Sequence, residues 1–122
     1  MSQADLPIGV FDSGVGGLTV VRAIRALMPE EDLLYLGDTA RVPYGTRSPA
    51  TVERYAQRVA GHLTRRGIKA LVVACNTATT YALDGLIREG ERRGIPVLGV
   101  ITPGVQAAIA ECQTHVGVIG TE

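Results

Sequence analysis

The sequence is poor in aromatic residues, cysteine and histidine, and it has no excess of charge of either sign. Aromatic residues make up 4% of the 122 residues, and twelve basic residues balance twelve acidic ones. A neutral chain offers no electrostatic case for binding nucleic acid. Two cysteines are too few for the disulfide framework of a small secreted domain. Because His62 and His115 show no metal-ligand spacing, no metal site is expected.

Long apolar runs are also missing. Uninterrupted runs such as residues 70–75 fall far short of the roughly 20 residues that cross a bilayer. The N-terminal stretch carries Asp5, whereas a secretion signal has a basic region there. We therefore expect a cytoplasmic protein that does not enter the membrane. Apolar residues make up 46% and charged residues 20%, as in an ordinary globular domain.

Apolar runs alternate with segments of helical periodicity. Five runs predict strands, at residues 6–11, 33–37, 70–75, 96–101 and 115–119. Helices are predicted over 16–28, 48–67 and 77–94, and another short helix is predicted to begin at Pro103. This alternation is typical of an α/β fold with an open parallel sheet flanked by helices in three layers, αβα. Because the chain stops where a further helix is expected, we expect a truncated domain.

The residues that follow the predicted strands carry most of the unusual chemistry. Ligands of open parallel sheets bind beyond the carboxyl ends of the strands. Cys75 follows the third strand and precedes a helix, whose N-terminus favours a thiolate. Asp12 and Ser13 follow the first strand, which is normally the neighbour of the third, so a carboxylate should lie near the thiol. Each residue also has a structural interpretation, Cys75 as a buried strand end and Asp12 with Ser13 as a helix cap.

Cofactor motifs are incomplete. The glycine-rich turn at 14–17 lacks the third glycine of a dinucleotide fingerprint, where Thr19 stands, and Asp12 would lie close to the pyrophosphate. The only lysine, Lys69, begins the third strand far from Cys75, which argues against pyridoxal phosphate. We therefore expect no cofactor. A thiol among small hydroxyl and amide groups suits proton transfer at the carbon of a small anionic molecule.

Four motifs, in this order and at this spacing, resemble the glutamate racemase family. They lie at residues 9–18, 37–45, 74–78 and 99–104. The resemblance implies a cofactor-independent isomerase of the bacterial cytosol that interconverts L- and D-glutamate. It also implies that D-glutamate, the small-molecule partner of this site, is supplied for peptidoglycan and hence for the cell wall and cell shape.

The resemblance assigns roles to residues that match the family motifs. Two cysteines act on opposite faces of the substrate, and Cys75 matches the one that takes the α-proton from D-glutamate. Asp12 matches the residue that assists it. The matching substrate-binding positions are Asp12, Ser13, Tyr44, Gly45, Asn76 and Thr77. Inversion needs deprotonation on one face and reprotonation on the other, which is why two thiols are required.

The sequence departs from the family in its length. Members of the family are about twice as long and have two similar α/β domains, so residues 1–99 are expected to form the first domain, without its C-terminal return segment. Residues 100–122 are expected to open the second domain. Cys112 stands in Cys-Gln-Thr-His, one residue longer than the second catalytic motif, and is interpreted as a structural thiol. This chain alone is therefore expected to have little or no racemase activity.

Two other functions stay open. One is a non-catalytic domain that binds a small anion or a protein partner, and the other is a related racemase that acts on aspartate. The family is often dimeric, and exposed apolar edges of an incomplete domain favour self-association, so a homo-oligomer is also considered.

Overall fold

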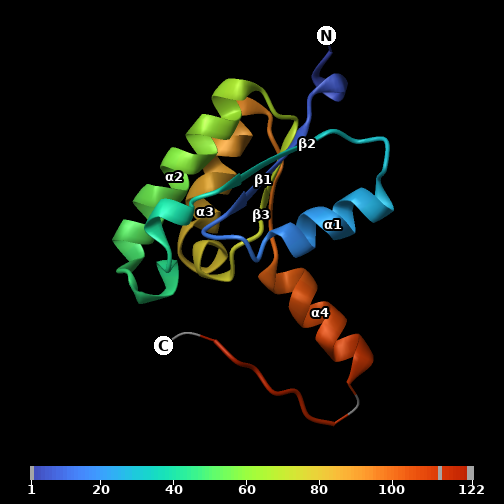
Figure 1. The fold of residues 1–122 in the computed structure, drawn as a ribbon, viewed down its shortest axis with the longest axis vertical. Coiled ribbons are helices and arrows are strands. Elements are labelled where there is room, and N and C mark those ends of the chain that lie inside the picture. Colours follow the sequence, from blue (N-terminus) through green and yellow to red (C-terminus); the bar gives the residue numbers. More distant parts are fainter. Residues whose placement is uncertain (1, 113, 121–122) are drawn as a thin grey trace.

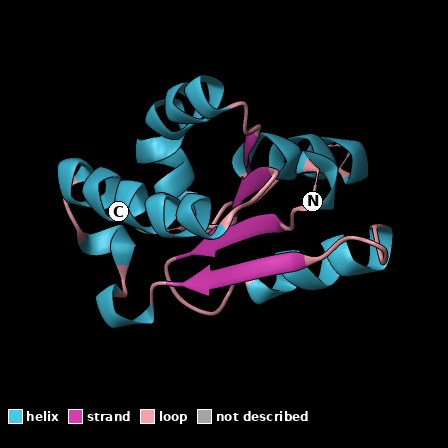
Figure 2. Cartoon of the chain, turned by 90° about the horizontal axis from the view of Figure 1, so that it is seen from above, coloured by secondary structure: helices cyan, strands magenta, loops and turns pink. Residues whose placement is uncertain are grey.

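The computed structural model describes residues 2–112 and 114–120. Its centre is a parallel sheet with the strand order β2-β1-β3-β4. The strands are β1 (Ile8–Asp12), β2 (Leu33–Gly37), β3 (Ala70–Val73) and β4 (Val97–Gly99). Helices lie on both sides of the strands, with α2 and α3 on one face and α1 on the other (Figures 1 and 2). The predicted three-layer α/β architecture is confirmed.

The helices begin and end at local signals in the sequence. They are α1 (Leu18–Leu27), α2 (Pro49–Arg66), α3 (Asn76–Arg93) and α4 (Ile101–Glu111), and three 3-10 turns are η1 (Gln3–Asp5), η2 (Thr39–Arg41) and η3 (Tyr44–Thr46). Ser48 caps α2 by accepting a hydrogen bond from the Thr51 amide, and Pro49 needs no amide partner there. Gly67 and Gly94, which end α2 and α3, have positive φ angles of 88° and 69° that favour glycine.

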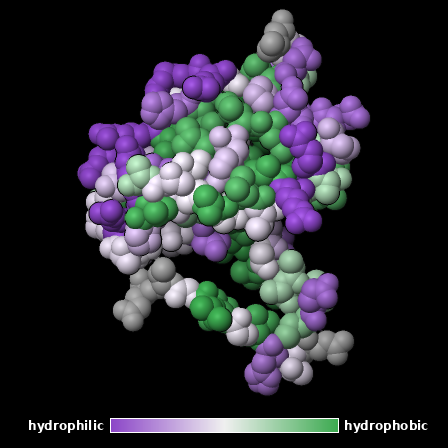
Figure 3. Space-filling model, in the orientation of Figure 1, coloured by the Kyte–Doolittle hydropathy of each residue, from purple (hydrophilic) through white to green (hydrophobic). Residues whose placement is uncertain are grey.

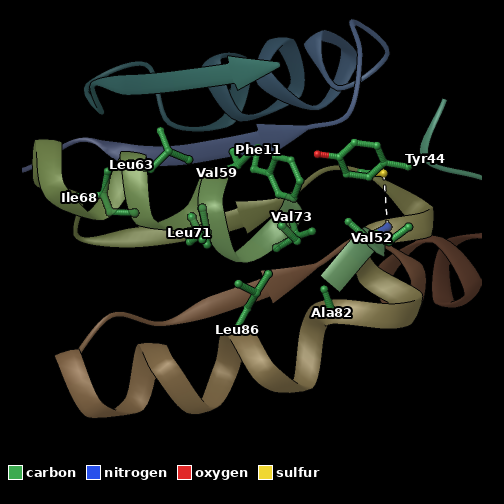
Figure 4. Packing of buried hydrophobic residues seen from close by; sticks show 14 residues of the cluster. Phe11, Tyr44, Val52, Val59, Leu63, Ile68, Leu71, Val73, Ala82 and Leu86 are labelled. Atoms are coloured by element: carbon green, nitrogen blue, oxygen red, sulfur yellow. Dashed lines mark hydrogen bonds between the residues drawn. The ribbon is translucent and has the colours of Figure 1, made fainter. Parts of the chain in front are cut away.

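The core lies between the central strands and the pair α2 and α3. β1 is buried along its whole length, and its side chains alternate between the two faces of the sheet. Phe11 packs with Val73 of β3, Leu63 of α2 and Leu86 of α3 in one continuous cluster (Figure 4). β1 and β3 are therefore held rigidly, and so are the residues that follow them.

The fifth predicted strand is absent. Residues 115–119 form no strand, and Val118 and Ile119 are fully exposed or nearly so. A strand needs a neighbouring edge for its backbone hydrogen bonds, and α4 leads this segment away from the sheet (Figure 1). The last helix also begins at Ile101, two residues before Pro103, which lies in its first turn. In the part of the chain that the structure describes, no helix has the length and apolar character to cross a bilayer.

Candidate active site

A hollow of about 470 Å³ lies at the carboxyl edge of the sheet. It is lined by the last residue of β1 and by residues that follow β1, β3 and β4, namely Asp12, Ser13, Gly16, Gly17, Thr19, Val20, Ala74, Cys75, Asn76, Thr77 and Val100. β1 and β3 are neighbours in the sheet, so their carboxyl ends meet at this edge. The sheet therefore brings together residues more than 60 positions apart in the sequence.

Cys75 lies at the junction of β3 and α3, where its side chain caps the helix. Its Sγ atom accepts a hydrogen bond from the Ala78 amide at 3.4 Å. The same atom donates to the Ser13 hydroxyl at 3.4 Å, so the thiol touches the loop that follows β1. Thr79 donates to the carbonyl oxygen of Cys75 at 2.8 Å and fixes the backbone at this point. The thiol is thus free, almost completely buried and held between two elements.

Asp12 is buried at the end of β1, and the turn that follows it orients its carboxylate. Oδ1 accepts from the Ser13 amide at 2.8 Å, and Oδ2 accepts from the Gly17 amide at 2.6 Å. A Cβ atom at Gly17 would lie 2.7 Å from the Asp12 Cβ, so this close approach requires glycine. The carboxylate is therefore fixed on the same loop that brings Ser13 to the thiol.

Tyr35 of β2 supports this loop from the side. Its hydroxyl donates to the carbonyl oxygen of Gly14 at 2.8 Å. Burial, followed by the negative charge of Asp12, raises the pKa of Tyr35 above its ordinary value. The tyrosine therefore stays a neutral hydrogen-bond donor to the loop at neutral pH.

Tyr44 lies in the core, although it was predicted to bind substrate. Its ring packs between Phe11 and Tyr55, with centroid distances of 6.2 and 5.6 Å. Its hydroxyl donates to Asp38 Oδ2 at 2.5 Å. Burial and this hydrogen bond raise the pKa of Tyr44 far above its ordinary value. Its side chain supports the 38–47 loop, and its predicted role in binding stays a prediction.

A second, larger hollow of about 810 Å³ adjoins the first. It lies between α3, α4 and residues 116–120, and Gly45, Asn76 and Thr77 are among its lining residues. Asn76 and Thr77 line both hollows, so the N-terminus of α3 faces a continuous depression. Gly45, another predicted substrate-binding residue, therefore lines the second hollow together with Asn76 and Thr77, and it does not line the first.

The other cysteine is placed differently. Cys112 ends α4, and its Sγ atom donates to the carbonyl oxygen of His115 at 2.6 Å. It does not line the hollow that holds Cys75. Within residues 2–112 and 114–120, no three histidine, cysteine or acidic side chains come together as a metal site.

The structure gathers Asp12, Ser13, Cys75, Asn76 and Thr77 at one edge, as the motif positions predicted. Sequence reasoning missed two residues that hold Asp12 and its loop in place, Gly17 and Tyr35. Gly17 was interpreted as a turn residue only, and Tyr35 was not singled out. The spacing of Asp12 and Gly17, five residues apart across a turn, could have indicated the hydrogen bond between them. No local signal points to the hydrogen bond of Tyr35, because it joins β2 to the loop that follows β1.

Comparison with known proteins identifies related chains. A family model described as Asp/Glu/hydantoin racemase matches residues 18–122. The glutamate racemase of Geobacter metallireducens is 57% identical over 116 residues, which are 94% of this chain and 42% of that protein. The glutamate racemase of Thermus thermophilus is 53% identical over 122 residues, which are 100% of this chain and 46% of that protein.

Solved structures match the fold as well. Glutamate racemase from Aquifex pyrophilus superimposes with a TM-score of 0.82 at 53% identity, over 88% of this chain and 42% of that one. The enzyme from Francisella tularensis in complex with D-glutamate gives a TM-score of 0.79 at 46% identity, over 84% of this chain and 38% of that one. The chain spans less than half the length of the curated relatives it matches. The family match over most of its length nevertheless shows that the chain belongs to the Asp/Glu/hydantoin racemase family.

Proposed function

We propose that this chain carries the first catalytic half of a glutamate racemase, with Cys75 as the base toward D-glutamate. One observation carries the proposal. The buried thiol of Cys75 lies at the N-terminus of α3 and donates a hydrogen bond to the Ser13 hydroxyl. It lines the same hollow as Asp12. Backbone amides at a helix N-terminus favour a thiolate and also attract a carboxylate group of the substrate.

The proposed step is a proton transfer at carbon. The Cys75 thiolate takes the α-proton of D-glutamate and becomes a thiol, and the electron pair of the broken C–H bond stays on the α-carbon, delocalised into its carboxylate. Asp12 assists the proton transfer, and Ser13, Asn76, Thr77 and Gly45 hold the polar groups of the substrate, with Tyr44 supporting Gly45. No cofactor takes part in this step.

Inversion also needs an acid on the opposite face of the α-carbon. Cys112 is poorly placed for this role, because α4 has eleven residues and rises about 16 Å from the sheet edge to its end. The second thiol would therefore come from outside the described residues. The proposal keeps residues 1–99 as a first domain and 100–122 as the opening of a second. In the cytoplasm, the proposed activity would supply D-glutamate for peptidoglycan.

The test is proton NMR of D-glutamate and, separately, L-glutamate in D2O with this chain. We expect the α-proton of D-glutamate to exchange without inversion, Cys75→Ser to abolish the exchange and Cys112→Ser to leave it unchanged. Exchange that survives Cys75→Ser would contradict the proposal. Full racemisation would show that an assembly of chains supplies the second thiol.

Two outcomes point to the alternatives. Faster exchange of D-aspartate than of D-glutamate would favour an aspartate racemase. No exchange of either amino acid, together with no protection of Cys75 from alkylation by D-glutamate, would favour a non-catalytic binding domain.

A further inference from the structure

The neutral charge of the whole chain conceals a basic face on α2. This helix carries four arginines and a single acidic residue, Glu53, whose carboxylate lies toward Gly85 of α3. The basic residues Arg54, Arg58, His62, Arg65 and Arg66 recur at helical spacing and so share one side of the helix. Among residues 2–112 and 114–120, none of these four arginines has an acidic partner within salt-bridge distance.

This basic face borders a groove between α2 and β2. The groove encloses about 460 Å³ over an apolar floor that includes Leu34 and Leu36. Its rim carries Arg41, Arg58, His62 and Arg66. Figure 3 shows hydrophobic surface on the face of the molecule where β2 lies, beside strongly hydrophilic residues over α2. The groove therefore offers apolar contact and uncompensated positive charge together.

The carboxylate of Asp38, which also lines the groove, does not offset this charge. Asp38 Oδ2 accepts the Tyr44 hydroxyl at 2.5 Å and forms an ion pair with Arg41 at 3.3 Å. The guanidinium of Arg41 also lies 4.7 Å from the centroid of the Tyr55 ring. Arg58 and Arg66 remain as positive groups without such a partner.

β2 is an edge strand whose outer side is open to pairing in the part of the chain that the structure describes. It is the last strand on its side of the sheet, and in the described part of the chain no other strand bonds to its outer edge. Its residues Leu33–Gly37 include no charge and no proline, the features with which natural edge strands usually prevent pairing. Two copies of this edge would bring two basic rims together and repel each other. An added strand that carries negative charge is therefore favoured at this edge over a second copy of β2.

We propose that the groove between β2 and α2 docks an extended acidic segment of a protein partner. The segment adds a strand to the outer edge of β2, and main-chain hydrogen bonds give it affinity. Its acidic side chains on the α2 side face Arg58 and Arg66. The groove runs along the flank of the sheet, so docking leaves the hollow at Cys75 open.

The test uses a fluorescein-labelled peptide of alternating glutamate and valine, with binding followed by fluorescence anisotropy. Reversing both charges with Arg58→Glu and Arg66→Glu is expected to weaken binding at least about tenfold. The matched control is Arg22→Glu with Arg25→Glu, two exposed positions on α1 at the opposite face, which changes the net charge equally and should weaken binding less than about threefold. Circular dichroism and thermal unfolding check that both variants fold, and Arg58→Gln serves as a milder variant.

Strand addition is separated from simple charge attraction by two further measurements. The peptide methylated on alternate backbone amides keeps its charge but cannot pair, and it should bind at least about tenfold more weakly. The unmethylated peptide should slow amide hydrogen exchange in residues 33–37. Equal binding of the methylated peptide or of oligothymidylate would show a surface that attracts any polyanion and would overturn the proposal. So would absence of binding or unchanged exchange in β2.

Discussion

Two regions of the molecule use similar aliphatic side chains in opposite ways. In the α/β body, residues 8–99, those of β3, α2 and α3 contribute to one continuous buried cluster, although Leu27 of α1 and Leu98 of β4 are exposed. In the C-terminal arm, residues 101–112 and 114–120, α4 has no buried residue and most aliphatic side chains are exposed, among them Val105, Ile109, Val116 and Ile119. The arm leads away from the sheet (Figure 1), and these side chains line an open hollow beside α3 without packing into the core of the body. Hydrophobic sequence alone does not make a core, because burial needs a second apolar surface.

The difference extends to the candidate site. Asp12, Ser13 and Cys75 belong to the body, where buried strands and backbone hydrogen bonds hold them. The arm contributes residues to the larger hollow, where Ile101, Val105 and Ile109 form an apolar wall. The candidate catalytic residues Asp12, Ser13 and Cys75 therefore lie in the body, whereas the arm adds apolar lining to the larger hollow.

The largest expected effect is a difference in the free energy of unfolding between a core substitution in the body and a surface substitution in the arm. Leu63 is 1% exposed and Ile109 is 68% exposed. Leu63→Ala should lower the free energy of unfolding by about 2–5 kcal/mol, because it leaves a cavity in the core. Ile109→Ala should change it by less than about 0.5 kcal/mol. Urea denaturation measures both, and similar losses for the two variants would contradict the division into body and arm.

A smaller effect is expected in the turn that holds Asp12. Gly17→Ala places a Cβ atom 2.7 Å from the Asp12 Cβ and should destabilise the body by about 1–3 kcal/mol. It should also slow the exchange of the D-glutamate α-proton, because Asp12 must move. Gly16→Ala is the matched control, since its Cβ meets no atom within 4 Å. If the control lost as much stability as Gly17→Ala, the contact with Asp12 would not be the cause.

Alkaline pH is expected to weaken the body through Tyr44. The folded state raises the pKa of Tyr44 above 10.0 by burial and by the hydrogen bond to Asp38. The unfolded state releases this proton near its ordinary pKa while the folded state keeps it, so the free energy of unfolding falls as pH rises above about 10. Tyr44→Phe should make that decline shallower, and the exposed Tyr81 provides the control Tyr81→Phe. Urea denaturation over this pH range would show equal slopes if Tyr44 were not responsible.

The smallest effect tests how tightly the arm is coupled to the body. Gly104 lies in α4, and a Cβ atom there meets nothing within 4 Å. Gly104→Ala should stabilise α4 locally by about 0.5–1 kcal/mol through helix propensity. Amide hydrogen exchange in α4 should slow, whereas the urea midpoint of the body should not move. A shift of that midpoint would show that the arm and the body unfold together.

Local signals in the sequence predicted the helices well. Ser48 with Pro49 and Gly67 marked the two ends of α2, and the structure has the helix between them. The fifth strand at 115–119 was predicted wrongly, because an apolar run shows that a segment can pair but not whether an edge is beside it. The residues at the strand ends were found by motif and by the rule for parallel sheets, and the structure places them around one hollow.

The sequence by itself determined the α/β class, the bounds of α2 and the residues that meet at the carboxyl edge, because periodicity, capping and motif spacing are local properties. Only the tertiary structure decided that the Tyr44 hydroxyl is bonded to Asp38, that Gly17 and Tyr35 hold the Asp12 loop, and that the arginines of α2 border the open edge of β2. These features join segments distant in the chain, and their partners are chosen by packing, which depends on every element at once.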